Sequence, residues 1–144
     1  MVDYAKAAFD LKARINARIK KKADLTAFFE SVRTSMGQEV EKANIELAAN
    51  KAPEMYLREE GYEEPTIELK CGSTICKVSQ DRNVPSISAI VSGESGETSV
   101  TYLILVDETP LLAQRVSLAP AVEEKVGTDA IAATIVESLI LGAA

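Results

Sequence analysis

The chain has 144 residues, of which 47% are apolar and 26% charged, with only seven glycines and five prolines. A chain of this length and composition is typical of one globular domain, so we expect a single domain over residues 1–144. The sequence has no histidine. This absence excludes Ser-His-Asp and Cys-His nucleophiles and imidazole metal sites.

Charge is divided unevenly along the chain, whose formal net charge is −6. Residues 1–22 hold seven Lys or Arg and two Asp, a net of +5, and the remaining residues hold nine basic and twenty acidic side chains, a net of −11. A basic segment of this kind suits nucleic acid, an anionic membrane or an acidic protein surface. The overall acidity and the lack of aromatic residues in "RIKKK" argue against nucleic acid.

The N-terminal segment does not resemble a signal peptide, because Asp3, Lys6 and Asp10 interrupt its apolar residues. No later segment is long enough to cross a bilayer. The first segment also lacks Trp, and its basic residues are typical of the solvated rim of a packed helix. We therefore expect a cytoplasmic protein that makes no membrane contact.

Apolar residues at helical spacing predict two N-terminal helices. The first has one narrow stripe, formed by Tyr4, Ala8, Leu11, Ile15 and Ile19. A continued helix would place Lys22 in this stripe, so we expect a break there with Asp24 as the next N-cap, one bent helix being the alternative. The second helix extends to about Asn50, with Ile45 opposite an apolar face of Leu25, Phe28, Phe29, Val32, Met36, Val40, Ala43 and Leu47.

After Pro65 the apolar period changes from 3.6 to 2, which predicts strands. Short connections join the segments "TIELKC", "TICKVS", "SISAIV", "SVTYLILV" and "LAQRVSL". We expect an antiparallel meander of four or five strands, with a further short strand near Met55 to Leu57. The fold class is therefore α+β, with the helices packed on one face of the sheet.

Both cysteines lie in the first hairpin, "KCGSTICKV". A turn at Gly72 and Ser73 places Glu68 opposite Lys77, whereas a turn one residue later opposes two lysines, so we favour the first register. In either register Cys71 and Cys76 share the apolar face. We interpret them as buried core thiols, with a disulfide as the alternative and no metal or other cofactor.

The last segment, "GTDAIAATIVESLIL", predicts a helix that has Thr128 as its N-cap and ends at Gly142. Its apolar residues spread over about half of the circumference, which is wider than packing on one sheet requires. We expect part of this face to meet a second copy of the chain. The candidate interface residues are Val136, Ile140 and Ile45.

The connector "REEGYEEPTIE" is strongly acidic, with Glu59, Glu60, Glu63, Glu64 and Glu68. Its spacing matches neither an EF-hand loop nor a paired-carboxylate site. We interpret it as a solvated connector that could also bind a cation or a basic partner, such as the first helix of another copy.

Three functions remain open from the sequence. We favour a non-enzymatic binding or assembly module that forms a homo-oligomer, with a dimer as the simplest case. The alternative is a small-molecule binding domain with a pocket between sheet and helices, for which the candidate lining residues are Phe28, Phe29, Met36, Cys76 and Tyr102. The weakest is an enzyme that uses carboxylate or tyrosine chemistry, because no motif places two acids at a defined separation.

Overall fold

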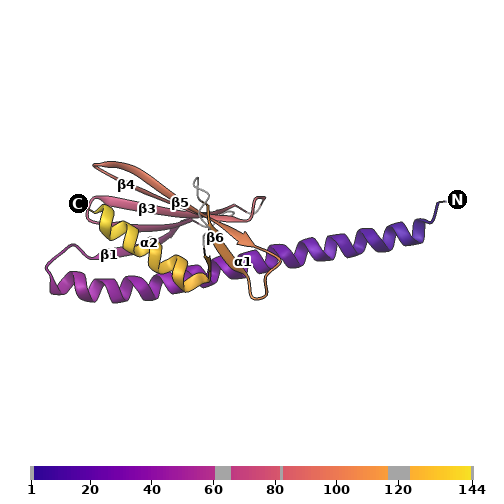
Figure 1. The fold of residues 1–144 in the computed structure, drawn as a ribbon, viewed down its shortest axis with the longest axis horizontal. Coiled ribbons are helices and arrows are strands. Elements are labelled where there is room, and N and C mark those ends of the chain that lie inside the picture. Colours follow the sequence, from indigo (N-terminus) through magenta and orange to yellow (C-terminus); the bar gives the residue numbers. More distant parts are fainter. Residues whose placement is uncertain (1, 61–65, 82, 117–123, 144) are drawn as a thin grey trace.

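The computed structural model describes residues 2–60, 66–81, 83–116 and 124–143. Its elements, in chain order, are α1 (Tyr4–Ala49), β1 (Met55–Glu60), β2 (Thr66–Cys71), β3 (Thr74–Asp81), β4 (Ser86–Gly93), β5 (Gly96–Leu105), β6 (Leu112–Arg115), β7 (Lys125–Val126) and α2 (Thr128–Gly142). Figure 1 shows both helices on the same side of a curled sheet. The predicted α+β class and the placement of the helices on one face agree with this arrangement.

The sheet is an antiparallel meander of seven strands in which each strand pairs with its neighbours in sequence. The prediction of four or five strands was too low. Strand β7 has two residues, too few to show a period of 2. Strand β1 lies at the sheet edge, and its charged second half, Arg58 to Glu60, obscures its alternation.

Helix α1 is one continuous helix of 46 residues, about 69 Å long at 1.5 Å per residue. The predicted break at Lys22 and the N-cap at Asp24 are therefore wrong. The break was expected because a lysine would enter the core, but every residue from 2 to 24 is exposed, so the ammonium group of Lys22 stays in water. The helix begins instead at Asp3, whose carboxylate accepts a hydrogen bond from the backbone N–H of Lys6 at 3.0 Å.

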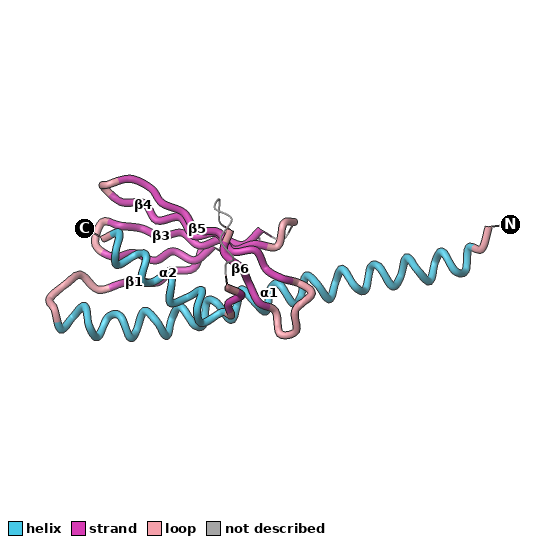
Figure 2. The backbone as a smooth tube through the Cα atoms, viewed as in Figure 1, coloured by secondary structure: helices cyan, strands magenta, loops and turns pink. Residues whose placement is uncertain are grey.

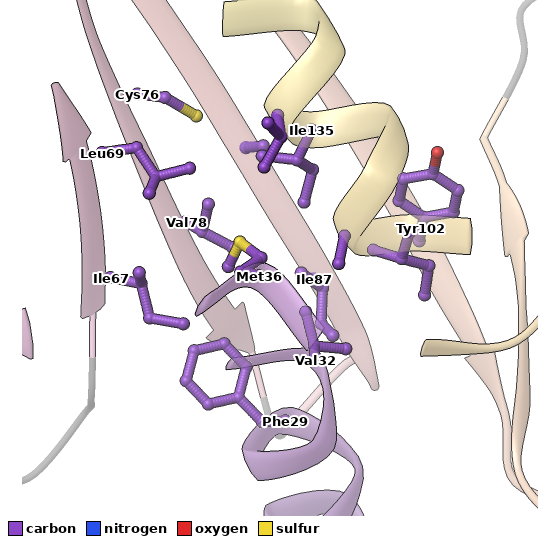
Figure 3. Packing of buried hydrophobic residues seen from close by; sticks show 14 of the residues in the cluster. Phe29, Val32, Met36, Ile67, Leu69, Cys76, Val78, Ile87, Tyr102 and Ile135 are labelled. Atoms are coloured by element: carbon purple, nitrogen blue, oxygen red, sulfur yellow. The ribbon is translucent and has the colours of Figure 1, made fainter. Parts of the chain in front are cut away.

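The core lies between the inner face of the sheet and the two helices. Figure 3 shows Phe29, Val32 and Met36 of α1 facing the side chains of the sheet. Alternate residues of β2 and β3 are buried, which is the pattern of a sheet covered on one face only. The residues that fill this layer without measurable exposure include Val32, Met36, Leu69, Cys76, Val78, Ile87, Ile131, Ile135 and Leu139.

Helix α2 packs on two neighbours, α1 and strands β2 to β4. The hydroxyl of Ser35 in α1 donates a hydrogen bond to Asp129 at 2.5 Å, and Thr74 of β3 donates one to the carbonyl of Gly142 at 3.4 Å. Two neighbours account for the wide apolar face of α2 within a single chain. Val136, predicted at an interface, is only 4% exposed and belongs to this core.

The cysteine hairpin has the predicted register. Glu68 lies opposite Lys77, and Leu69 lies opposite Cys76. Gly72 has a φ of 62°, the positive value that the first central residue of this turn requires. A side chain at this position would be strained.

Candidate functional site

Helix α1 has two halves with different surroundings. We call Tyr4–Asp24 the arm and residues 25–49 the packed half. Burial begins at Leu25, and every residue of the arm is exposed among the residues that the structure describes. Figure 2 shows the arm extending well beyond the sheet. At 1.5 Å per residue the arm is about 30 Å long.

The arm exposes an apolar stripe in the position that the sequence predicts. The exposed fractions of its large side chains are 77% for Tyr4, 50% for Leu11, 46% for Ile15 and 62% for Ile19. Scattered single apolar residues are normal on a protein surface, but a continuous line of them on one helix face marks a contact surface. The structure therefore makes this stripe the first candidate for a functional surface.

Basic residues border the stripe on both sides. At 100° per residue, Lys12 and Arg18 lie about 60° to either side of Ile15, and Lys22 lies within about 20° of it. The acids of the arm, Asp10 and Asp24, and the N-cap Asp3 all lie more than about 110° away from the same line. The stripe is therefore an apolar line with a positive rim.

The stripe faces the side of the molecule on which strand β1 lies. Ile15 and Arg33 are 18 residues apart, and 18 residues make about five full turns, so their side chains leave the helix in the same direction. Arg33 binds Glu59 of β1 at 2.5 Å. Asn44, within about 20° of the same line, binds the backbone N–H and C=O of Met55 at 2.7 and 3.1 Å. One face of the molecule thus carries the arm stripe at one end and β1 at the other.

The β1 end of this face is acidic. Glu54 is exposed, and the side chains of Glu30 and Glu59 remain 50% and 51% exposed although both bind Arg33. These two carboxylates raise the pKa of Arg33, chiefly because the Arg33 guanidinium donates hydrogen bonds to Glu30. Tyr56 adds an apolar ring that is 68% exposed, on the opposite side of the strand from Glu59 because successive side chains of a strand alternate. Glu68, in the next strand, binds Arg58 at 3.4 Å, and Glu63 and Glu64 lie outside the described residues.

Gln80 fixes the helix at the point where the arm leaves the body. Its side-chain N–H donates a hydrogen bond to the carbonyl of Leu25 at 2.8 Å. Gln80 is 8% exposed, and within the part of the chain that the structure describes its side-chain oxygen has no hydrogen-bond partner. A buried polar group in this position holds the root of the arm in place at some cost in stability.

The residues predicted to line a pocket do not form one together. Phe29, Met36, Cys76 and Tyr102 are buried in the core. Phe28 borders a groove of about 680 Å³ between the root of the arm, the β5–β6 connection and the start of α2. This groove is open and also carries Lys20, Asp24 and Glu108, the last of which binds Lys125.

The remaining predicted interface residues lie on different sides of the molecule. Ile45 is 70% exposed, on the side of α1 opposite its packed face. Ile140 is 37% exposed and borders a second groove, of about 310 Å³, with Leu47 and Pro53. The exposed arm was missed because periodicity shows which residues share a face but not whether that face is covered. Lys22 in the line of the stripe was the available signal.

Both cysteines are free and buried. Burial raises the pKa of the Cys76 thiol to about 11 and also raises the pKa of Cys71. A raised pKa keeps a thiol protonated and poorly nucleophilic. Among the described residues no group of three or more Cys, Asp or Glu side chains is arranged to hold a metal ion.

Neither helix has a stretch of sufficient length and hydropathy to cross a lipid bilayer in the ranges that the structure describes. Comparisons with protein-family models, curated proteins and solved structures found no match to this chain. The geometry of the arm and of the β1 side is therefore the main guide to function.

Proposed function

We propose that the protein is a non-enzymatic assembly module that forms a homo-oligomer, in the simplest case a dimer, through its arm. The observation that carries this proposal is the stripe of Tyr4, Leu11, Ile15 and Ile19, all at least 46% exposed. Complete burial of one such side chain contributes about 1.5–3 kcal/mol. Covering the stripe would therefore stabilise a complex by several times that amount before the costs of association.

The arm also has little to hold it in shape when it stands alone. In proteins most of the stability of a helix comes from tertiary packing, which the arm lacks. Contact with a partner would bury the stripe and reinforce the helix together. The C-terminal helix is less suitable as an interface because α1 and the sheet cover most of its apolar face.

We place this activity in the cytoplasm. The support is the pair of free cysteines, because thiols persist in reducing compartments. Burial raises the pKa of both thiols, which keeps them protonated and poorly reactive.

Sedimentation velocity at low micromolar concentration tests the proposed assembly. The wild-type chain should sediment as a dimer, and Ile15→Glu should shift it to a monomer, because a carboxylate in the centre of the stripe cannot be buried without a partner. Ala13→Glu is the matched control, since it adds the same charge about 160° away from Ile15. A wild-type chain that stays monomeric over the accessible concentration range would refute the proposal.

A further inference from the structure

We infer that the arm binds to a second copy of the chain. The surface that receives it is the one around β1 that carries Glu54, Tyr56 and Glu59, which we call the β1 side. Two copies would pack about a two-fold axis with their α1 helices antiparallel, and each arm would lie across the partner's β1. This inference rests on the assembly proposed above and names the receiving surface. It makes the interface isologous, with the same face used twice.

The first observation that supports this inference is the direction in which the stripe points. Ile15 points in the same direction as Arg33 and Asn44, which hold β1 beside the helix. A partner that lies on the stripe therefore meets the side of the molecule that displays β1. A two-fold axis across this face brings the arm of each copy to the β1 of the other.

The second observation is the distribution of charge. The stripe has Lys12 and Arg18 at its rim and Lys22 in its line, whereas the β1 end of the same face has Glu54 together with Glu30 and Glu59, which both bind Arg33. An antiparallel pair places the basic end of one copy on the acidic end of the other at both contacts. Complementary potentials of this kind favour the correct docking partner and orientation.

The alternative of pairing two arms is disfavoured by the same charges. Two stripes in contact would bring the basic rims together, and none of Asp3, Asp10 and Asp24 lies close enough to the stripe to offset them. Like charges at a helix contact are destabilising. An anionic lipid surface also suits a basic amphipathic helix, but it would leave the acidic β1 side facing the same negative charges.

Length and exposed surface are compatible with the contact. The arm is about 30 Å long, and a strand of the length of β1 spans about 20 Å. Tyr56 stands out from β1 with 68% of its surface exposed. A large aromatic side chain of this kind is the residue type that most often anchors an interface.

Mixed crosslinking tests the receiving surface directly. Two variants, Ile15→Cys and Tyr56→Cys, are prepared separately, mixed and treated with a short bismaleimide. We expect a crosslink between the two variants and little between two Ile15→Cys chains. The native cysteines are 3% and 0% exposed, so the wild-type chain treated in the same way is the background control.

Charge variants test the same contact without a new thiol. Glu54→Lys should raise the dimer dissociation constant about tenfold, equivalent to about 1.4 kcal/mol. Glu94→Lys, at the tip of the β4–β5 hairpin, makes the same change of net charge away from the proposed contact and should leave the constant within about twofold. On the arm, Arg18→Glu should weaken the dimer more than Lys20→Glu, because Lys20 lies about 140° from Ile15.

The outcomes separate this inference from the proposed assembly. A dimer that crosslinks through two Ile15→Cys chains would overturn the β1 contact and leave an arm-dependent assembly intact. A dimer in which Ile15→Cys and Tyr56→Cys do not crosslink would also overturn the β1 contact. A monomer that cosediments with vesicles rich in phosphatidylserine would overturn both, and would assign the arm to a membrane surface.

Discussion

The two halves of α1 have similar apolar patterns but different surroundings. The packed half buries Phe29, Val32 and Met36 against the sheet and α2, whereas the arm exposes Leu11, Ile15 and Ile19. Core packing therefore fixes the first group, and only helical hydrogen bonds fix the second. The amphipathic period of a helix therefore depends on its own sequence, whereas the burial of its apolar face depends on whether another part of the protein packs against that face.

The largest expected difference between the two halves is in the cost of removing an aromatic ring. Phe29→Ala should lower the free energy of unfolding by about 3–5 kcal/mol, because the ring is 2% exposed and leaves a cavity. Phe9→Ala, in the arm and 73% exposed, should change it by less than about 0.5 kcal/mol. Urea unfolding of both variants measures the contrast, and equal losses would show that the arm is packed in solution.

The next effect is at Gln80, where the two halves meet. Gln80→Glu should cost about 2–4 kcal/mol at neutral pH, because it places a charge in a buried position and removes the donor to Leu25. Gln80→Leu, of similar size, should change stability by about 1 kcal/mol or less, because the unpaired oxygen is lost together with the hydrogen bond. If both variants unfold at the same urea concentration, Gln80 is not buried in solution.

A smaller effect depends on the sheet layer beneath the packed half. Cys76 has a pKa raised to about 11 from a reference of 9.0, so between these values the unfolded chain binds fewer protons than the folded chain. Stability should therefore fall by up to about 2–3 kcal/mol as the pH rises from 9 to 11. Urea unfolding at several pH values measures the slope, and Cys76→Ala should remove this part of it. An unchanged slope in that variant would assign the loss to other groups.

The smallest effect compares glycine and alanine in the two halves. Gly37→Ala should stabilise the protein by about 1 kcal/mol, because a Cβ at this position meets no atom within 4 Å and alanine favours the helix. Ala13→Gly, in the arm, should reduce helical content without changing the midpoint of global unfolding. Circular dichroism during thermal unfolding reports both quantities. A lower midpoint for Ala13→Gly would show that the arm unfolds with the core.

Much of the body could be predicted from the sequence because local chemistry determines it. The turn at Gly72 and the pairing of Glu68 with Lys77 were sufficient for the register of the first hairpin. The burial of Cys71 and Cys76 followed from the apolar face that they share in either register. Strand β7 could not be predicted, since two residues carry no period, and it is a strand only because β6 lies beside it.

The arm was harder to predict because α1 can continue through Lys22 only if that side chain is in water, and the sequence pattern does not show which residues are in water. Lys22 in the line of Leu11 and Ile15 was interpreted as a helix break, on the assumption that the stripe is buried in its own chain. The same lysine is compatible with a straight helix in water. The uneven charge of the chain indicated a basic segment that could bind an acidic surface. It did not indicate that this segment extends beyond the sheet and α2.

Because α1 is unbroken, the number of residues between the stripe and the packed half sets the direction of the stripe relative to β1. Inserting or deleting a single residue between Lys22 and Leu25 would turn the stripe by about 100° relative to β1 while leaving its composition and charge intact. An insertion of 18 residues would restore the direction after about five turns and lengthen the arm by about 27 Å. The helix thus transmits any change in its length near Asp24 to the arm. Such a change would turn the stripe toward a different neighbour without altering any of the side chains that make the contact.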